Sequence, residues 1–185
     1  ALIQGASFPT TAIKLGQIMT DFTVTDAVTN KKVSLSGLFN GPDGVANTED
    51  DKKMVLINFF FTTCGPCINE IPYMLASYEK YKDDVAIIGL DSNGDTQDDV
   101  KYFAIDMGVN FPMASVSELW SLAIANSAGI TSYPTNLVID RYGAVTLIEV
   151  GGITSQTPFN LMFEYFSADD YKQTLVTDIA QITPV

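Results

Sequence analysis

Two segments of the chain are apolar over the length of a β-strand. Residues 54–61 (MVLINFFF) contain Asn58 as their single polar residue, and residues 85–90 (VAIIGL) contain none. Short continuous apolar runs are typical of strands buried on both faces, as in a parallel sheet covered by helices. We therefore predict two central strands, the second of which ends at Asp91, where the loop SNGD begins. The C-terminal end of such a strand is a position at which loops approach a site.

Helical patterns follow both strands. The first extends from residue 64 to residue 81 and contains Pro72, which we expect to kink the helix rather than end it, because the apolar period continues beyond it. Residues 97–107 place apolar side chains on one face, and residues 117–127 predict a further helix. Strands that alternate with helices indicate an α/β fold.

Shorter strands are predicted nearer the ends of the chain. Residues 22–25 and 33–35 are separated by a turn around Asn30 and predict an N-terminal pair of strands. Residues 135–140 and 144–150 predict a second hairpin, which follows the helices.

The two ends of the chain have weaker patterns. Residues 1–15 have no clear period and are predicted to be a tether or an arm packed on the domain, while residues 16–185 are predicted to form one domain. The tail contains residues 158–166 and then residues 169–179, which predict a final helix that covers one face of the sheet. A chain of 185 residues with 46% apolar content is long enough to bury a sizeable core.

The charge balance excludes one class of partner. The formal net charge is −12 and the pI is near 4.1, whereas recognition of nucleic-acid phosphates needs a basic surface. The polar loop of residues 40–53 is rich in acids, but their spacing does not match the calcium-binding loop of an EF-hand, and a solvated loop is predicted. No apolar run reaches the length of a membrane span. The chain begins with Ala1, so we expect that a signal sequence or lipoprotein anchor has been removed, although a recombinant product would look the same.

The only two cysteines, Cys64 and Cys67, lie between the first central strand and its helix, with Gly65 and Pro66 between them. A thiolate is the nucleophile in disulfide exchange, and the N-terminus of a helix lowers the pKa of a thiol placed there. Cys64 is therefore predicted to attack a partner, and the more buried Cys67 is predicted to resolve the mixed disulfide. Pro66 suits the first helical turn, where its missing N–H costs nothing.

Other uses of two cysteines fit this chain less well. Structural zinc needs four ligands, and the chain has no histidine and no further cysteine. A c-type haem site needs histidine after the second cysteine, where Ile68 stands, and a copper site of two cysteines would need a histidine. An inert structural disulfide remains an alternative, although so short a loop would gain little stability from it.

Two further positions are candidates for a role at this site. Glu70 lies one turn after Cys67 in an otherwise apolar stretch, so burial would raise its pKa and let it exchange protons with that thiol. An ordinary solvated glutamate is the alternative. The Tyr133-Pro134 pair precedes a predicted strand, and a cis proline there would present extended backbone to a substrate peptide. A plain proline at the start of a strand is the alternative.

Taken together, these segments resemble the thioredoxin fold, and specifically its extracytoplasmic TlpA-like or ResA-like thiol–disulfide oxidoreductases within the redoxin group. The resemblance extends from about residue 16 to residue 152, and is carried by DFTVTDAVTNKKVSLSGLF, NFFFTTCGPCINEIPYM, IIGLDSNGD and GITSYPTNLVIDRYGAV. It implies a central mixed β-sheet flanked by helices, with an N-terminal β-hairpin extension and a C-terminal helix.

The resemblance also implies roles for individual residues. Cys64 would be the nucleophile, Cys67 the resolving thiol, Glu70 the proton-handling acid and Pro134 a cis proline that faces the disulfide. Asn58 stands where cytosolic thioredoxins carry a buried aspartate, which fits the branch that places the acid at the helix position instead.

One departure from the family pattern lies beside the nucleophile. Thr63 stands where the family usually has tryptophan, which removes a large flat surface next to the sulfur.

The function expected from this resemblance is that of an extracytoplasmic reductase of protein disulfides. Its partners would be disulfide-containing or dithiol proteins and a membrane thiol transporter that supplies electrons, and it would act as a monomer without a cofactor. A redox-inactive binding module with a closed disulfide is the alternative. A thiol peroxidase is less favoured, because Phe61 stands where peroxiredoxins need a threonine.

Overall fold

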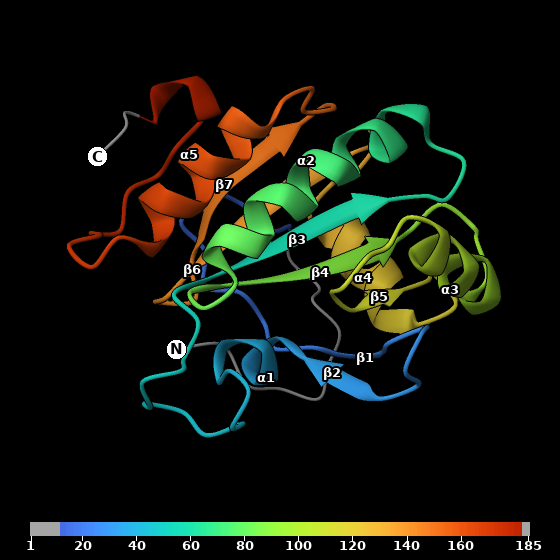
Figure 1. Cartoon of the computed structure of the whole chain (residues 1–185), viewed down its shortest axis with the longest axis horizontal. Helices are drawn as coiled ribbons and strands as arrows, with labels where there is room; N and C mark the ends of the chain where they lie inside the picture. Colours follow the sequence, from blue (N-terminus) through green and yellow to red (C-terminus); the bar gives the residue numbers. More distant parts are fainter. Residues whose placement is uncertain (1–11, 183–185) are drawn as a thin grey trace.

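A five-stranded mixed sheet runs through the middle of the computed structural model, which describes residues 12–182 (Figure 1). The strands lie in the order β5-β4-β3-β6-β7. β3 is parallel to β4 and antiparallel to β6, and β7 is antiparallel to β6. The strand bounds are Met113–Ala114 (β5), Val85–Asp91 (β4), Met54–Phe60 (β3), Thr135–Asp140 (β6) and Val145–Val150 (β7).

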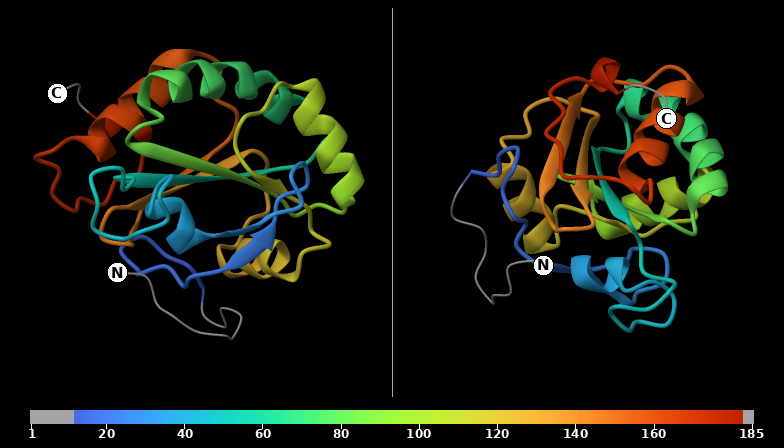
Figure 2. Two further views of the ribbon diagram at one scale, coloured as in Figure 1. Left: turned by 60° about the horizontal axis from the view of Figure 1, so that its bottom comes forward. Right: turned by 90° about the vertical axis from the view of Figure 1, so that its left-hand side faces the viewer.

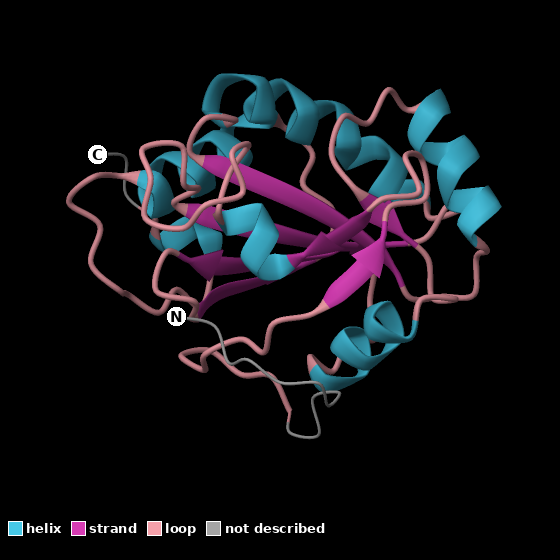
Figure 3. Cartoon of the chain, turned by 90° about the horizontal axis from the view of Figure 1, so that it is seen from below, coloured by secondary structure: helices cyan, strands magenta, loops and turns pink. Residues whose placement is uncertain are grey.

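Helices cover both faces of this sheet, as the side views and the view from below show (Figures 2 and 3). One face packs against α2 (Gly65–Tyr81), α3 (Gln97–Asp106) and α5 (Gln156–Ser167). The other face packs against α4 (Leu119–Ser127), α1 (Leu35–Phe39) and a separate antiparallel hairpin of β1 (Thr23–Thr25) and β2 (Lys32–Ser34). The predicted α/β fold with an N-terminal hairpin is confirmed, and so are the two central strands.

The central strand β3 shows why its sequence is apolar throughout. Successive side chains of a strand point to opposite faces, so Val55 and Ile57 pack towards α4 and the hairpin while Leu56 packs towards α2. Every residue of β3 is buried, which a strand in the middle of a covered sheet requires. The same alternation places Asn58 on the face that α2 covers.

Helix α2 begins directly after the cysteine turn and continues through its internal proline. Cys64 is the N-cap residue with extended backbone, and Pro66 lies in the first turn. Pro72 lies inside the helix, which nevertheless continues to Tyr81, as predicted. The rigid helix therefore carries both sulfur atoms at its N-terminus.

The prediction of a final helix at residues 169–179 is wrong. The C-terminal helix is α5 (Gln156–Ser167), whose buried side chains are Phe159, Met162, Phe163, Phe166 and Ser167. Residues 169–179 are instead mostly irregular and meet β7 at one isolated bridge, where the Val176 N–H donates to the Thr146 carbonyl oxygen at 2.9 Å. Pairing with an exposed strand edge satisfies backbone groups that a helix would have satisfied internally, so tertiary contact overrides the local pattern.

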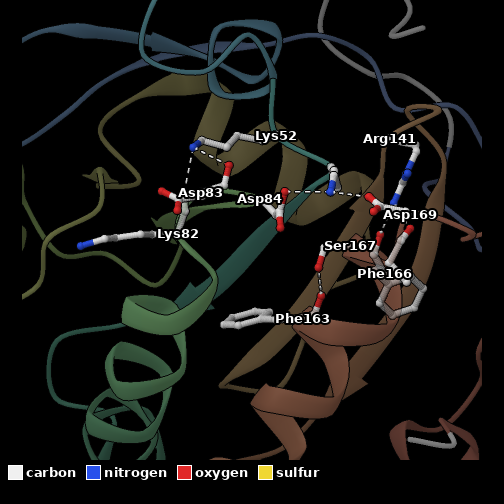
Figure 4. A network of polar contacts seen from close by, with 11 residues as sticks. Lys52, Lys82, Asp83, Asp84, Arg141, Phe163, Phe166, Ser167 and Asp169 are labelled. Atoms are coloured by element: carbon white, nitrogen blue, oxygen red, sulfur yellow. Dashed lines mark hydrogen bonds and ion pairs between the residues drawn. The ribbon is translucent and has the colours of Figure 1, made fainter. Parts of the chain in front are cut away.

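At the end of the sheet where β3 begins, two cations bind carbonyl groups just beyond helices (Figure 4). Lys52 Nζ donates to the carbonyl oxygens of Lys82 (2.8 Å) and Asp83 (2.9 Å), just beyond the C-terminus of α2. Arg141 Nη2 donates to the carbonyl oxygen of Ala168 (2.6 Å), just beyond α5. These cations satisfy carbonyl groups at helix C-termini, where positive charge is favourable. They lie at the opposite end of β3 from the cysteines.

Part of the predicted N-terminal arm lies outside the described residues, namely residues 1–11. Within the remainder, the Ile13 N–H donates to the Ser127 carbonyl oxygen at 2.5 Å, and Ile13 and Leu15 pack against the core. Among residues 12–182, no helix combines the length and the apolar character that crossing a membrane requires.

Candidate active site

The cysteine pair lies where β3 gives way to α2. The chain turns after Phe60, with the Cys64 N–H donating to the Phe61 carbonyl oxygen at 3.1 Å, and α2 begins at Gly65. Cys64 and Cys67 form a disulfide with their Cα atoms 5.2 Å apart. The Cys67 N–H points at Cys64 Sγ at 3.3 Å. A free amide of the first helical turn is therefore aimed at the sulfur that is predicted to attack, which favours its thiolate form.

Both cysteines are buried in this disulfide form. Cys64 is 4% exposed and Cys67 is 1% exposed, so the predicted asymmetry has the expected direction but is small. The exposed residues around them are Thr63, Gly65 and Pro66. A partner would approach Cys64 through this rim of small side chains, where the family tryptophan is absent.

Glu70 is buried on the same side of α2 as Cys67. Its side chain is 0% exposed, which excludes the alternative of a solvated glutamate. Oε1 accepts hydrogen bonds from Asn58 Nδ2 (2.9 Å) and Asn136 Nδ2 (3.2 Å), and Oε2 accepts one from the Ile153 N–H (3.1 Å). Burial raises the pKa of Glu70 to about 7, against the opposing effect of these three donors. The carboxyl is therefore poised to gain or lose a proton near neutral pH.

Two asparagines hold this carboxyl from the sheet. Asn58 on β3 and Asn136 on β6 are directly paired in register, and Asn58 Nδ2 donates to Asn136 Oδ1 at 2.8 Å. Sequence reasoning identified Asn58 but missed Asn136 and the amide of Ile153. The signal for Asn136 was weak, because Thr135 and Asp140 are also polar residues of the same strand.

The peptide bond between Tyr133 and Pro134 is cis, as the family resemblance implies. Pro134 is buried, and the Tyr133 ring packs edge-on against Phe61 with a centroid distance of 5.4 Å. The Tyr133 hydroxyl is 2.8 Å from Ser92 Oγ. The loops after β3 and β4 and the loop before β6 therefore meet around the cysteine turn.

A fourth segment reaches the site through Gly152, which follows β7. A Cβ atom at Gly152 would lie 3.1 Å from Pro66 Cβ, so the absence of a side chain lets the backbone approach the cysteine loop closely. The next residue, Ile153, supplies the amide that binds Glu70. This segment contacts the cysteine loop and the buried acid at once.

Beneath the cysteine turn lies a pair of carboxyls that sequence reasoning did not identify. Asp91 at the end of β4 is 0% exposed, and its Oδ1 accepts from the Asn93 N–H at 3.0 Å. Asp95 Oδ2 accepts from the Thr62 N–H at 2.7 Å. Burial, together with the neighbouring Asp95, raises the pKa of Asp91 to about 8. The strand-end position had been predicted to approach a site, but not these contacts.

A cysteine pair at a helix N-terminus, beside a cis proline on a mixed sheet of this strand order, defines the class of thioredoxin-fold thiol–disulfide oxidoreductases. The family model described as Redoxin matches residues 5–160. The chain belongs to the Redoxin family.

Individual relatives agree with this assignment. Thiol-disulfide oxidoreductase ResA of Bacillus thuringiensis (strain Al Hakam) is 33% identical over 156 residues, which are 84% of this chain and 80% of that protein. A thioredoxin-family thiol:disulfide interchange protein from Chlorobium tepidum TLS has a similar fold, with a TM-score of 0.67 and 22% identity, over 85% of this chain and 100% of that chain. The thioredoxin domain of a Bacteroides vulgatus thiol-disulfide oxidoreductase has a TM-score of 0.64 and 19% identity, over 84% and 99% of the respective chains.

Proposed function

We propose that this chain is an extracytoplasmic oxidoreductase that reduces disulfides in substrate proteins. The observation that carries the proposal is the placement of Cys64 Sγ at the N-terminus of α2, with the buried Glu70 carboxyl on the same helix. The Gly65-Pro66 insert resembles that of reducing thioredoxins, which supports the direction. An acid on the helix and an amide at Asn58 resemble the extracytoplasmic branch, which supports the location.

The reaction begins from the dithiol form. The Cys64 thiolate attacks one sulfur of the substrate disulfide, and the S–S bond of the substrate breaks. The other substrate sulfur leaves as a thiolate and takes a proton from solvent. Cys64 and the substrate are then joined by a mixed disulfide.

Cys67 completes the transfer of two electrons. Its thiol gives its proton to Glu70, whose pKa of about 7 keeps a fraction of the carboxyl ionised at neutral pH. The resulting thiolate attacks Cys64 Sγ, forms the Cys64–Cys67 disulfide and releases the second substrate sulfur as a thiolate. This thiolate takes a proton from Glu70 or from solvent, and the substrate leaves as a dithiol. A dithiol partner, which we propose to be a membrane thiol transporter, must then reduce the enzyme again.

The reduction potential of the cysteine pair tests the direction. It is measured by equilibration in glutathione or dithiothreitol buffers followed by thiol trapping. We expect a value near or below that of thioredoxin, about −270 mV. A value well above it would indicate an oxidant or an isomerase instead.

The low exposure of Cys64 favours a second candidate, a binding module whose disulfide stays closed. The two candidates differ in the Cys67→Ser variant, whose Cys64 is a free thiol without its resolving partner. An oxidoreductase should trap insulin, used as a model disulfide protein, in a stable mixed disulfide, and the matched Cys64→Ser variant should trap far less. Equal trapping of insulin by the two variants would support the binding module. So would a wild-type disulfide that is reduced only when the protein unfolds.

A further inference from the structure

We propose that Asp91 and Asp95 share one proton and that this pair positions the turn that carries Cys64, so that raising the pH loosens the turn. The inference rests on the proposed function for its catalytic meaning. The pair itself is a property of the fold that can be tested without any substrate.

The first observation is that the Asp91 carboxyl lacks a donor for one of its oxygens. Asp91 lies at the end of β4, directly opposite Phe60 in the parallel register with β3. Its side chain is 0% exposed, and among residues 12–182 no N–H or O–H group reaches its Oδ2. Its carboxyl instead lies within hydrogen-bonding reach of the Asp95 carboxyl. A buried polar atom without a donor is costly, whereas a protonated Asp91 would be the donor to Asp95.

The second observation links this pair to the nucleophile. Asp95 Oδ2 accepts from the Thr62 N–H at 2.7 Å. Thr62 lies in the turn that connects β3 to Cys64. The ionised Asp95 therefore ties that turn to the loop after β4, while Asp91 holds Asp95 from the interior.

The charges around the pair favour a single proton on it. Asp99 in the first turn of α3 is a further negative group that faces Asp95. The ring hydroxyl of Tyr133 reaches the same loop only through Ser92. None of the ion pairs formed by the described residues supplies a lysine or arginine to either carboxyl. Two adjacent carboxylates without a cation repel each other, so one of them keeps its proton at neutral pH.

Loss of that proton changes the geometry of the turn. When Asp91 gives its proton to solvent, its contact with Asp95 turns from a hydrogen bond into a repulsion between like charges. Asp95 is on the exposed side of the pair and can move away, and Thr62 then loses its acceptor. Cys64 would therefore be held less firmly at a pH above the one at which the pair loses its shared proton. Asp91 and Asp95 are thus positioning residues rather than catalytic ones.

The test uses the oxidised protein, in which no thiol titrates. The amide chemical shift of Thr62 is followed by NMR from about pH 6 to about pH 10, together with the carboxyl carbon shift of Asp91. We expect both signals to titrate with one midpoint, near the value of about 8 that burial gives the pKa of Asp91. In the Asp91→Asn variant, whose amide donates to Asp95 without titrating, the Thr62 signal should stay flat. The Glu70→Gln variant is the control and should keep the Thr62 titration.

The shared proton can be refuted without an activity assay. A Thr62 signal that does not titrate in the wild-type protein overturns it, and so does a titration that survives in Asp91→Asn. If Asp91→Asn does not fold, the wild-type carbon shift alone decides, because an Asp91 that is already ionised at about pH 6 contradicts the shared proton. In thiol-exchange assays with the reduced protein, the wild type should slow relative to Asp91→Asn as the pH rises, because only the wild-type turn loosens. The midpoint of this change should match that of the Thr62 titration. A chain without any exchange activity would remove the proposed function and leave the NMR result standing.

Discussion

Asn58 Nδ2 donates a hydrogen bond to Glu70 Oε1 at 2.9 Å, and neither side chain reaches solvent. This contact joins the middle of β3 to the helix that carries both cysteines. Because a neutral amide is the donor, the carboxyl is held in place without a cation that would keep its pKa low. The effect of burial on the pKa of Glu70 then exceeds that of its hydrogen bonds, and the carboxyl titrates near neutral pH.

Replacing Asn58 by aspartate should move that titration upwards. In Asn58→Asp, a second buried carboxyl faces Glu70, so the apparent pKa of the pair rises above about 7, and the oxidised protein loses stability above neutral pH. The carboxyl carbon shifts of both residues measure the change. Asn69→Asp adds the same charge at the exposed neighbour of Glu70 on α2 and should leave the titration in place. An unshifted midpoint in Asn58→Asp would contradict the close contact.

Replacing Glu70 by glutamine should flatten the dependence of stability on pH. The folded-state pKa of Glu70 is raised from 4.5 to about 7, so its contribution to stability is fully present below 4.5 and is lost as the pH rises through about 7. At about 1.4 kcal/mol per pKa unit, the wild type loses about 3 kcal/mol over this window that Glu70→Gln does not lose. Urea unfolding of the oxidised proteins at several pH values measures the difference. The control is Glu79→Gln on the exposed side of the same helix. Parallel curves for wild type and Glu70→Gln would refute the burial effect.

Glu70→Gln should also slow exchange and shift the pKa of Cys67, because glutamine cannot accept its proton. Thiol-exchange rates measured against pH should lose the inflection near the pKa of Glu70, about 7. An unchanged rate and pH profile would remove the proton-handling role while leaving the role of the cysteines intact.

Adding side-chain atoms at Gly152 should disturb the cysteine loop in proportion to their size. The Cβ atom of alanine would lie 3.1 Å from Pro66 Cβ, so the loop must shift by a few tenths of an ångström, and valine would demand more. Exchange should slow from Gly152 to alanine to valine, while the free energy of unfolding falls by about 1–3 kcal/mol at most. Rates of insulin reduction and urea titrations measure the two effects. Equal rates in all three proteins would mean that the contact does not restrain the loop.

Removing the cap of α3 should destabilise the loop that carries Asp95. Thr96 and Asp99 form a capping box, with the Thr96 side chain accepting from the Asp99 N–H. Thr96→Ala should cost about 1 kcal/mol of unfolding free energy, and Thr154→Ala at an exposed position should cost much less. Thermal and urea unfolding measure both. Equal stability of the two variants would show that the cap is not formed in solution.

The pattern of apolar and polar residues along the chain predicted most of the helices and strands. Long apolar runs and clear helical periods are each compatible with few other secondary structures. The two central strands, the helix that continues past Pro72 and both hairpins are all present in the structure. Residues 169–179 were predicted wrongly, because their pattern is too weak to show that Val176 pairs with the edge of β7. Long-range pairing of this kind leaves no local signal.

The sequence by itself determined the chemistry: two cysteines three positions apart at a strand-to-helix junction, with an acid one turn later in an apolar stretch. Those features depend on neighbours along the chain, and helical periodicity relates such neighbours directly. Only the tertiary structure decided the environment of that chemistry. Asn136, Ile153 and Asp95 are distant in sequence from the groups that they contact, and they meet those groups because parallel and antiparallel strands bring their ends to one edge of the sheet. Burial of Glu70 and Asp91 follows from that assembly, and their raised pKa values follow from their burial.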